Sequence, residues 1–300
     1  MSKKQLVVLT LLFIAIVSVA VFQKYVDNAS YSPKNEKFLS VNTGLVDRVT
    51  LTMPSKEIIT LSKTGTNWDI TTPINSRADN EKVNTILNEA KNIVTTGTIS
   101  TNKDKFDEFQ VNEKGTHVEF FQNNEKKAGF YIGKISDDYV HTYARKDTED
   151  TTYLAKGILQ GSFQTPLVTL RDKTVTKLKP EEVSEIIFKS DTDKLTLSNT
   201  NNVWSSTPKS DVANEIIQST VMALLSINAE NILENSPIKR EDLLSSADLK
   251  LFIRRTNPDL KSVVLYLKSQ DSKLYAAEES SQNIFELNSI LKDEITKVFK

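Results

Sequence analysis

The chain has 300 residues, of which 38% are hydrophobic and 26% charged, and its 38 Lys and Arg nearly balance its 39 Asp and Glu to a formal net charge of −1. This composition is ordinary for a folded globular protein and lacks the basic excess that marks a nucleic-acid binder. The chain has no Cys, which excludes disulfides, thiol nucleophiles and thiolate metal sites, and it has neither the GxGxxG nor the GxxxxGK[ST] loop that would bind a nucleotide.

An uncharged apolar segment occupies residues 6–22. As a helix it would be about 26 Å long, which is close to the thickness of a bilayer core. We therefore predict an N-terminal transmembrane anchor within residues 1–25. A cleaved signal peptide is the alternative, because residues 18–20 fit a small-x-small cleavage site, and a buried soluble helix is a third interpretation.

The charges around this segment bear on its orientation. Lys3 and Lys4 favour a cytoplasmic N-terminus. Lys24 on the other side weakens the contrast, but long domains are translocated largely regardless of their charge. We expect a single-pass protein of a bacterial membrane with its C-terminal domains outside the cytoplasm. Residues 26–40 are polar and are predicted to be a linker.

The rest of the chain contains an internal repeat. Each copy begins with two short strand-like runs, reaches one of the two Trp residues of the protein, and then a Pro. In the first copy these features are residues 46–51, residues 58–61, Trp68 and Pro73. In the second copy they are residues 183–188, residues 194–197, Trp204 and Pro208.

Each copy continues with one amphipathic helix. In the first copy the apolar stripe consists of Val83, Ile86, Leu87, Ala90, Ile93 and Val94. In the second copy it consists of Ile216, Ile217, Thr220, Val221, Leu224 and Leu225. Asp79 is the predicted N-cap of the first helix, and Ser210 or Asp211 that of the second.

Strand-like runs return after each helix. In the first copy they are residues 116–121, 130–132, 140–145 and 152–154. In the second copy they are residues 249–253, 263–267, 273–277 and 284–287. Leu287, Leu291, Ile295 and Val298 fit one face of a C-terminal helix.

This order of elements predicts an α+β fold of two tandem repeated modules, each a mainly antiparallel sheet with a covering helix. We place the modules at residues 41–175 and 176–300, because the segment around this boundary is polar and ends in Pro180. Trp68 and Trp204 are expected to anchor the two cores, since both copies need one. A stacking platform for a sugar or a peptide is the alternative role of these residues.

The sequence presents no candidate catalytic, cofactor-binding or metal-binding residue, and we predict that the protein is not an enzyme. Its two His residues, His117 and His141, lack the spacing of a metal motif and are expected at or near the surface. Pairs of adjacent acids, such as Asp107 with Glu108, are expected in turns. A Ser–His–Asp triad stays open because its members need not be close in sequence, although no GxSxG elbow is present.

The first copy resembles a known family. The residues that carry the resemblance are residues 49–51, 68–70, Pro73, residues 78–79, 130–133, 143–145 and 170–172. In this order they are similar to an uncharacterised bacterial domain family that is often encoded beside gliding-motility-type ABC transporter components. The resemblance covers residues 46–173. The second copy departs from it, because Tyr275 is followed by Ala276 and Ala277 where the first copy has Tyr143 and Arg145 in a Tyr-x-Arg pattern.

The resemblance implies one N-terminal membrane segment and an extracytoplasmic accessory role in a transport or envelope complex, and it provides no active site. We therefore expect a binding or scaffold protein whose partners are the bilayer, through residues 6–22, and an ABC-type permease and ATPase, with no nucleic acid or nucleotide. A free-standing envelope binder of glycan or peptide, with an exposed aromatic cleft, is the alternative. An enzyme, which would need converging polar groups with perturbed pKa values, is the third hypothesis.

Overall fold

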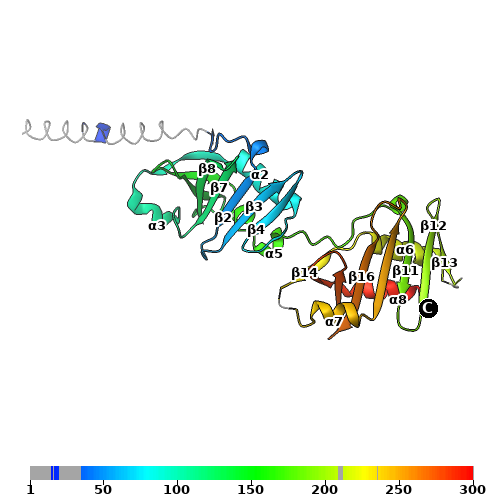
Figure 1. Ribbon diagram of the computed structural model, residues 1–300. Coiled ribbons are helices and arrows are strands. Elements are labelled where there is room, and N and C mark those ends of the chain that lie inside the picture. Colours follow the sequence, from blue (N-terminus) through cyan, green and yellow to red (C-terminus); the bar gives the residue numbers. More distant parts are fainter. Residues whose placement is uncertain (1–14, 16, 20–34, 209–211, 235, 300) are drawn as a thin grey trace, which may run out of the picture. The chain divides into compact units, whose positions relative to one another are not determined.

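The computed structural model describes residues 15, 17–19, 35–208, 212–234 and 236–299, and the chain divides into two units, residues 1–171 and 172–300 (Figure 1). Most of the predicted anchor at residues 6–22 lies outside the described residues, as does most of the predicted linker. In the part of the chain that is described, none of the helices combines the length and the apolar character that crossing a membrane requires.

The first unit contains β1 (Glu36–Lys37), η1 (Thr43–Leu45), β2 (Arg48–Thr52), β3 (Ile58–Thr64), β4 (Asn67–Thr72), β5 (Ser76–Arg77), α2 (Asn80–Asn92), β6 (Val94–Ser100), η2 (Lys103–Lys105), α3 (Phe106–Phe109), β7 (Thr116–Gln122), β8 (Glu125–Ile135), β9 (His141–Lys146), β10 (Thr152–Lys156), α4 (Gln160–Phe163) and α5 (Leu167–Leu170).

The second unit contains η3 (Pro180–Glu182), β11 (Val183–Lys189), β12 (Lys194–Thr200), β13 (Val203–Thr207), α6 (Asn214–Leu225), β14 (Ala229–Leu233), α7 (Arg240–Ser245), β15 (Leu249–Arg255), β16 (Val263–Gln270), β17 (Lys273–Glu278), β18 (Ile284–Leu287) and α8 (Ser289–Lys297).

Each unit has one antiparallel sheet, and the two sheets share one strand order. The first runs β1-β6-β10-β9-β8-β7-β2-β3-β4-β5 and the second β13-β12-β11-β15-β16-β17-β18-β14. Without β1 and β5, and read from the other end, the first order becomes β4-β3-β2-β7-β8-β9-β10-β6, which matches the second strand for strand. The prediction of an α+β fold with antiparallel sheets is confirmed. The strands β6 and β14, which follow the helices, were not predicted.

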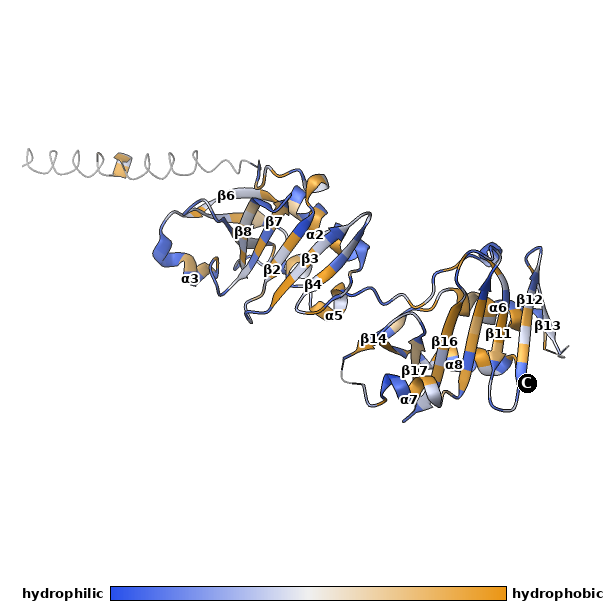
Figure 2. Cartoon of the chain, in the orientation of Figure 1, coloured by the Kyte–Doolittle hydropathy of each residue, from blue (hydrophilic) through white to orange (hydrophobic). Residues whose placement is uncertain are grey.

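Alternation along the strands separates the two faces of each sheet. In β2 the side chains of Val49 and Leu51 are buried while their neighbours are only partly buried, as expected for a strand with one face on the core. Figure 2 shows hydrophobic positions alternating with hydrophilic ones along the strands of both units. Trp68 and Trp204 lie in the two cores, each only 3% exposed, so their interpretation as core anchors is confirmed and their interpretation as stacking platforms is wrong.

Helix α2 carries the chain across the first sheet, from β5 at one edge to β6 near the other. Asp79 caps it, as predicted, by accepting hydrogen bonds from the backbone of Glu81 and Lys82. The predicted apolar stripe extends too far. The helix ends at Asn92, where Ile93 turns to an extended conformation and Val94 begins β6.

Two expectations for the second unit are also wrong. The predicted cap residues Ser210 and Asp211 lie outside the described residues, and α6 begins later, after Ala213, which has no side-chain cap bond. Leu287 was predicted both at the end of the strand 284–287 and on the face of a C-terminal helix. It is the last residue of β18, where it pairs with Leu274, so only its helical assignment is wrong. Apolar residues recur at every second position in a strand and at every third or fourth position in a helix. Where a strand leads into a helix, one apolar residue can fit both patterns, so the boundary between the two elements is ambiguous.

Three hairpins are closed by two-residue turns in the left-handed region. These turns are Asn123 and Asn124, Asn201 and Asn202, and Asp271 and Ser272, with φ angles between 51° and 65°. Two successive residues at positive φ are typical of the type I′ turn, whose twist matches that of the flanking strands. Asn and Asp tolerate this conformation better than other residues with a side chain, which explains why the chain reverses with little Gly.

Candidate functional site

The outer face of each sheet, opposite the helix α2 or α6, carries the polar side chains that could act on a ligand or partner. A short helix covers part of this face in both units. In the first unit α3 packs its Phe109 against Tyr143, with ring centroids 4.7 Å apart. In the second unit α7 places Leu243 in a small apolar cluster with Tyr275. The uncovered remainder differs strongly between the two units.

In the first unit a polar cluster of His117, Glu119, Lys126 and Asp147 lies on the outer face. Nε2 of His117 is 2.9 Å and 3.0 Å from the two carboxylate oxygens of Asp147. Nζ of Lys126 lies 2.5 Å from Asp147 and 2.7 Å from Glu119. The ring of His117 also stacks on that of Tyr131, its cross-strand partner, at 4.3 Å. The cluster therefore joins β7, β8 and the end of β9.

Gly129 makes room for this cluster. A Cβ atom at this position of β8 would lie 2.1 Å from a carboxylate oxygen of Asp147 and 2.5 Å from Cε of Lys126. These distances are shorter than any van der Waals contact, so a larger residue would displace both side chains. Glycine in a strand interior often marks such a close approach.

The charges of the cluster stabilise one another. Burial by itself would raise the pKa of Asp147, but hydrogen bonds from His117 and Lys126 outweigh it and hold this pKa below its ordinary value. Burial would likewise lower the pKa of Lys126, yet its hydrogen bonds to Asp147 and Glu119 raise it. Lys126 is thus held as a cation between two carboxylates.

The ligand atoms of His117, Glu119 and Asp147 lie within 4.8 Å of one another, and such a set could in principle hold a divalent metal. The ammonium group of Lys126 already occupies the position between the two carboxylates, where it contributes the positive charge that a metal would supply. A metal ion would first have to displace it. The arrangement therefore works best as an ion-paired cluster with Lys126 as its cation, which sequence reasoning missed because Lys126 and Asp147 are distant from His117 in the chain.

His141 lies apart from this cluster. Its Nδ1 is 2.6 Å from the carboxylate of Asp138, which lies three residues earlier in the turn before β9. The carboxylate of Asp138 also accepts a hydrogen bond from the hydroxyl of Ser136 and from the backbone of Val140, and these contacts strongly lower its pKa. Both His residues are partly buried, and the structure does not bring them into one site.

Arg145 is a buried cation under α3. Its guanidinium lies over the rings of Phe106 and Tyr131, at 4.3 Å and 4.6 Å, and its nitrogens donate to the backbone carbonyls of Val111, Lys146 and Glu149. These bonds tie the segment containing α3 to the turn after β9. In the second unit Arg240 of α7 makes equivalent bonds from the helix side, to the carbonyls of Glu278, Glu279 and Ser281. Arg240 thus takes the place of the arginine that the second copy lacks in its Tyr-x-Arg position.

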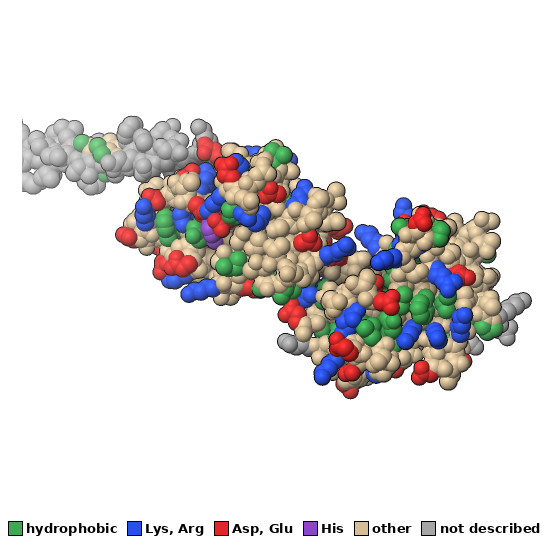
Figure 3. Space-filling view, in the orientation of Figure 1, with side chains coloured by type: hydrophobic (Ala, Val, Ile, Leu, Met, Phe, Trp, Pro, Cys, Tyr) green, Lys and Arg blue, Asp and Glu red, His purple; other side chains and the backbone are tan. Residues whose placement is uncertain are grey.

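In the second unit the outer face carries two parallel rows of side chains that run across the strands. The lysine row consists of Lys194, Lys189 and Lys250, which are direct cross-strand neighbours on β12, β11 and β15. The apolar row consists of Ile187, Phe252 and Val264, which are neighbours on β11, β15 and β16. In Figure 3 hydrophobic side chains on this unit are flanked by Lys and Arg.

Corresponding positions of the first unit carry other residues. The lysine row is replaced by Ile58, Thr52 and His117, and the apolar row by Thr50, Glu119 and Gly129. The fold therefore requires neither lysines nor apolar residues at these positions.

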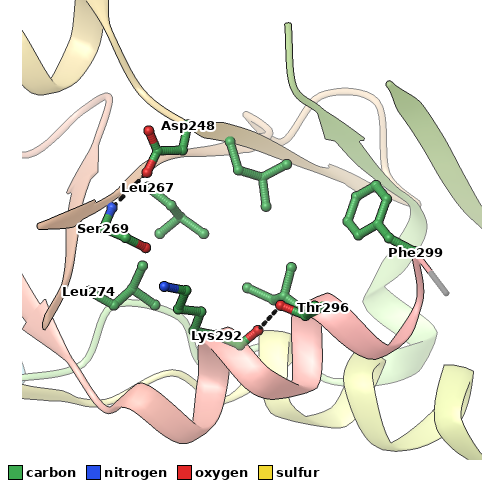
Figure 4. Close-up of a pocket in the computed structure, with 9 residues that line it drawn as sticks. Asp248, Leu267, Ser269, Leu274, Lys292, Thr296 and Phe299 are labelled. Atoms are coloured by element: carbon green, nitrogen blue, oxygen red, sulfur yellow. Dashed lines mark hydrogen bonds between the residues drawn. The ribbon is translucent and has the colours of Figure 1, made fainter. Parts of the chain in front are cut away.

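The second unit also contains an apolar pocket of about 190 Å³ between α8 and the strands β15, β16 and β17 (Figure 4). Leu267, Leu274 and Phe299 face it, with Asp248 and Lys292 at its margin. Asp248 accepts a hydrogen bond from the backbone of Ser269. The volume is below the usual range for a small-molecule site, about 300–1,000 Å³, and suits a single apolar side chain.

Comparison with known proteins adds the family. Residues 68–246 match the family described as domain of unknown function DUF4340. The chain belongs to the DUF4340 family. The match begins at Trp68 in β4 and ends just after α7, so it extends across both units. No curated protein and no solved structure matches the chain.

Proposed function

We propose that this protein is a non-catalytic, membrane-tethered binding or scaffold protein outside the cytoplasm, and an accessory component of an ABC-type transport or envelope complex. The lysine and apolar rows of the second unit carry this proposal. Three lysines side by side repel one another, and in the described part of the chain none of them forms an ion pair. A partner that supplies carboxylates to the lysines and apolar side chains to the apolar row would stabilise such a surface.

Two further observations support a non-catalytic role. In the polar cluster of His117, the cation Lys126 is held between the carboxylates of Glu119 and Asp147 within the unit. Arg145, the other polar group under α3, donates to backbone carbonyls that hold loops in place. The membrane tether rests on the apolar segment at residues 6–22. The association with gliding-motility-type ABC transporter components rests on the resemblance described above and on nothing in the geometry.

The experiment is a mild-detergent pull-down of the full-length protein from its native membrane, followed by mass spectrometry. We expect stoichiometric recovery of a permease and an ATPase. Recovery of the protein alone would refute the accessory role.

The alternative, a free-standing envelope binder of glycan or peptide, is favoured by a pocket of about 450 Å³ in the first unit. This pocket lies between α2 and the α4–α5 segment, and polar side chains that include Lys82, Ser162, Gln164 and Thr169 line it. Hydroxyl and amide groups of this kind can bind sugar hydroxyls or a peptide backbone. Binding of peptidoglycan fragments that is lost in Gln164→Ala, with no partner protein recovered, would favour this alternative.

A further inference from the structure

We infer that the lysine row and the apolar row together form the docking surface for an acidic, amphipathic segment of another protein. This inference rests on the binding function proposed above and names the chemistry of the partner.

The lysine row places three positive charges close together on the outer face. Neighbouring strands are about 4.8 Å apart, so the three ammonium groups of the lysine row are anchored along a line of about 10 Å. Lys189 and Lys194 are exposed, and Nζ of Lys250 lies 5.1 Å from the ring centroid of Tyr266. The carboxylates nearest in sequence are Asp191 and Asp193, in the turn between β11 and β12, and Asp248 just before β15. Asp193 accepts a hydrogen bond from Thr192, and Asp248 accepts one from the backbone of Ser269. In the described part of the chain, no carboxylate forms an ion pair with a lysine of the row.

Elsewhere on the same outer face, a basic side chain is paired with a carboxylate on the neighbouring strand. Glu185 of β11 faces Arg254 of β15 across the strands, and their charged atoms are 2.9 Å apart. The same outer face thus carries basic residues that are paired with a carboxylate, Arg254 and Lys273, beside the three lysines of the row, which in the described part of the chain are not. Carboxylates spaced about 5–6 Å apart would match the lysine row, and a helix presents them at that spacing with acids three or four residues apart.

The apolar row decides between a protein and a lipid surface. Ile187 and Val264 are each only 8% exposed, so they form a recessed floor beside longer lysine side chains. Insertion into a bilayer requires apolar side chains that project about 5–10 Å into it, which these cannot do. An apolar side chain of a partner can pack on Phe252, the one partly exposed residue of the row, while neighbouring carboxylates meet the lysines.

The first unit does not offer this surface. At the corresponding positions it has Thr52 and His117 in place of two of the lysines, and Glu119 in place of Phe252. Glu119 and His117 are already bound within the polar cluster. We therefore expect the two modules to have diverged in use, with docking confined to the second.

The test is zero-length cross-linking with a water-soluble carbodiimide in native membranes, which joins a lysine amine to a carboxylate in direct contact. We expect Lys189, Lys194 and Lys250 to form amide bonds with Asp or Glu of one other protein. The triple variant K189Q/K194Q/K250Q should lower recovery of that protein about tenfold, because three charge contacts are lost. The matched variant K63Q/K91Q/K156Q removes the same charge from exposed positions of the first unit and should leave recovery unchanged.

A third variant separates charge from reactivity. K189R/K194R/K250R should restore recovery of the partner but not the cross-links, since a guanidinium does not form the amide. The inference is overturned if the glutamine variant recovers the partner at the wild-type level, or if the lysines cross-link only within the chain. It is also overturned if vesicles of phosphatidylglycerol protect the lysines from an amine reagent without any partner protein. If wild-type protein recovers no partner at all, the proposed function fails, and the inference with it.

Discussion

Replacing Gly129 with Ala should destabilise the first unit, although Gly→Ala substitutions in strands and helices usually stabilise. The added Cβ would lie 2.1 Å from a carboxylate oxygen of Asp147, so this carboxylate has to shift from the position in which it contacts His117 and Lys126. The contacts of Asp147 with His117 and with Lys126 are partly exposed, so their strength lies between that of an exposed ion pair and that of a buried charged hydrogen bond. Together they should stabilise the unit by about 2 kcal/mol. Alanine also lowers the conformational entropy of the unfolded chain, which stabilises the folded unit by about 0.4–1 kcal/mol. We expect a net loss of about 1–1.5 kcal/mol.

Gly161 provides the matched control. It lies in α4, and a Cβ atom there would meet nothing within 4 Å, so Gly161→Ala should be neutral or stabilising by up to about 1 kcal/mol. Urea unfolding in a Trp204→Phe background measures the first unit alone, because Trp68 is then the single Trp of the chain. The reasoning is wrong if the two alanine variants shift the transition in the same direction.

The pH dependence gives a second readout of the same cluster. Because the pKa of Asp147 is lower in the folded protein than its ordinary value, its contribution is present above the unfolded pKa of about 3.9 and is lost as the pH falls through the folded pKa. This part of the acid dependence should disappear in Gly129→Ala. It should also disappear in Asp147→Asn, and the double variant should lose little more than either single one.

Three further predictions follow from single contacts. Trp204→Ala removes a buried indole and should lower the free energy of unfolding of the second unit by about 3–5 kcal/mol. Limited proteolysis should then digest the second unit while the fluorescence of Trp68 stays native. Loss of both units together would contradict the division into two cores. Asp79→Ala should cost about 1 kcal/mol by loss of the N-cap of α2, measured by urea unfolding, whereas Asp79→Asn should be nearly neutral. Burial and the hydrogen bond to Glu149 raise the pKa of Tyr153 to about 12, so its contribution to stability should be lost as the pH rises from about 10 to 12. Tyr153→Phe should remove this part of the fall in the free energy of unfolding at alkaline pH.

Much of the secondary structure is visible in the sequence. Apolar residues alternate in the strands around Val49 and Leu51, and they recur at helical spacing in α2, because side chains on one face of an element must reach the same core. The cap at Asp79 is equally local, since it joins residues two and three positions apart. The errors fall at junctions such as Ile93 and Leu287, where one apolar residue satisfies both periods. The strand β6 is missed because its Gly and Thr residues alternate only weakly with apolar ones.

The sites are a matter of tertiary structure. The sequence by itself determined that the chain repeats one α+β module, that each copy has a core Trp, and that nucleotide loops and thiol chemistry are absent. Only the strand order decided that Asp147 reaches His117 over Gly129, and that Lys189, Lys194 and Lys250 stand in one row. These contacts join residues from different strands, and their register depends on pairing between distant segments. No local pattern of residue types records such pairing.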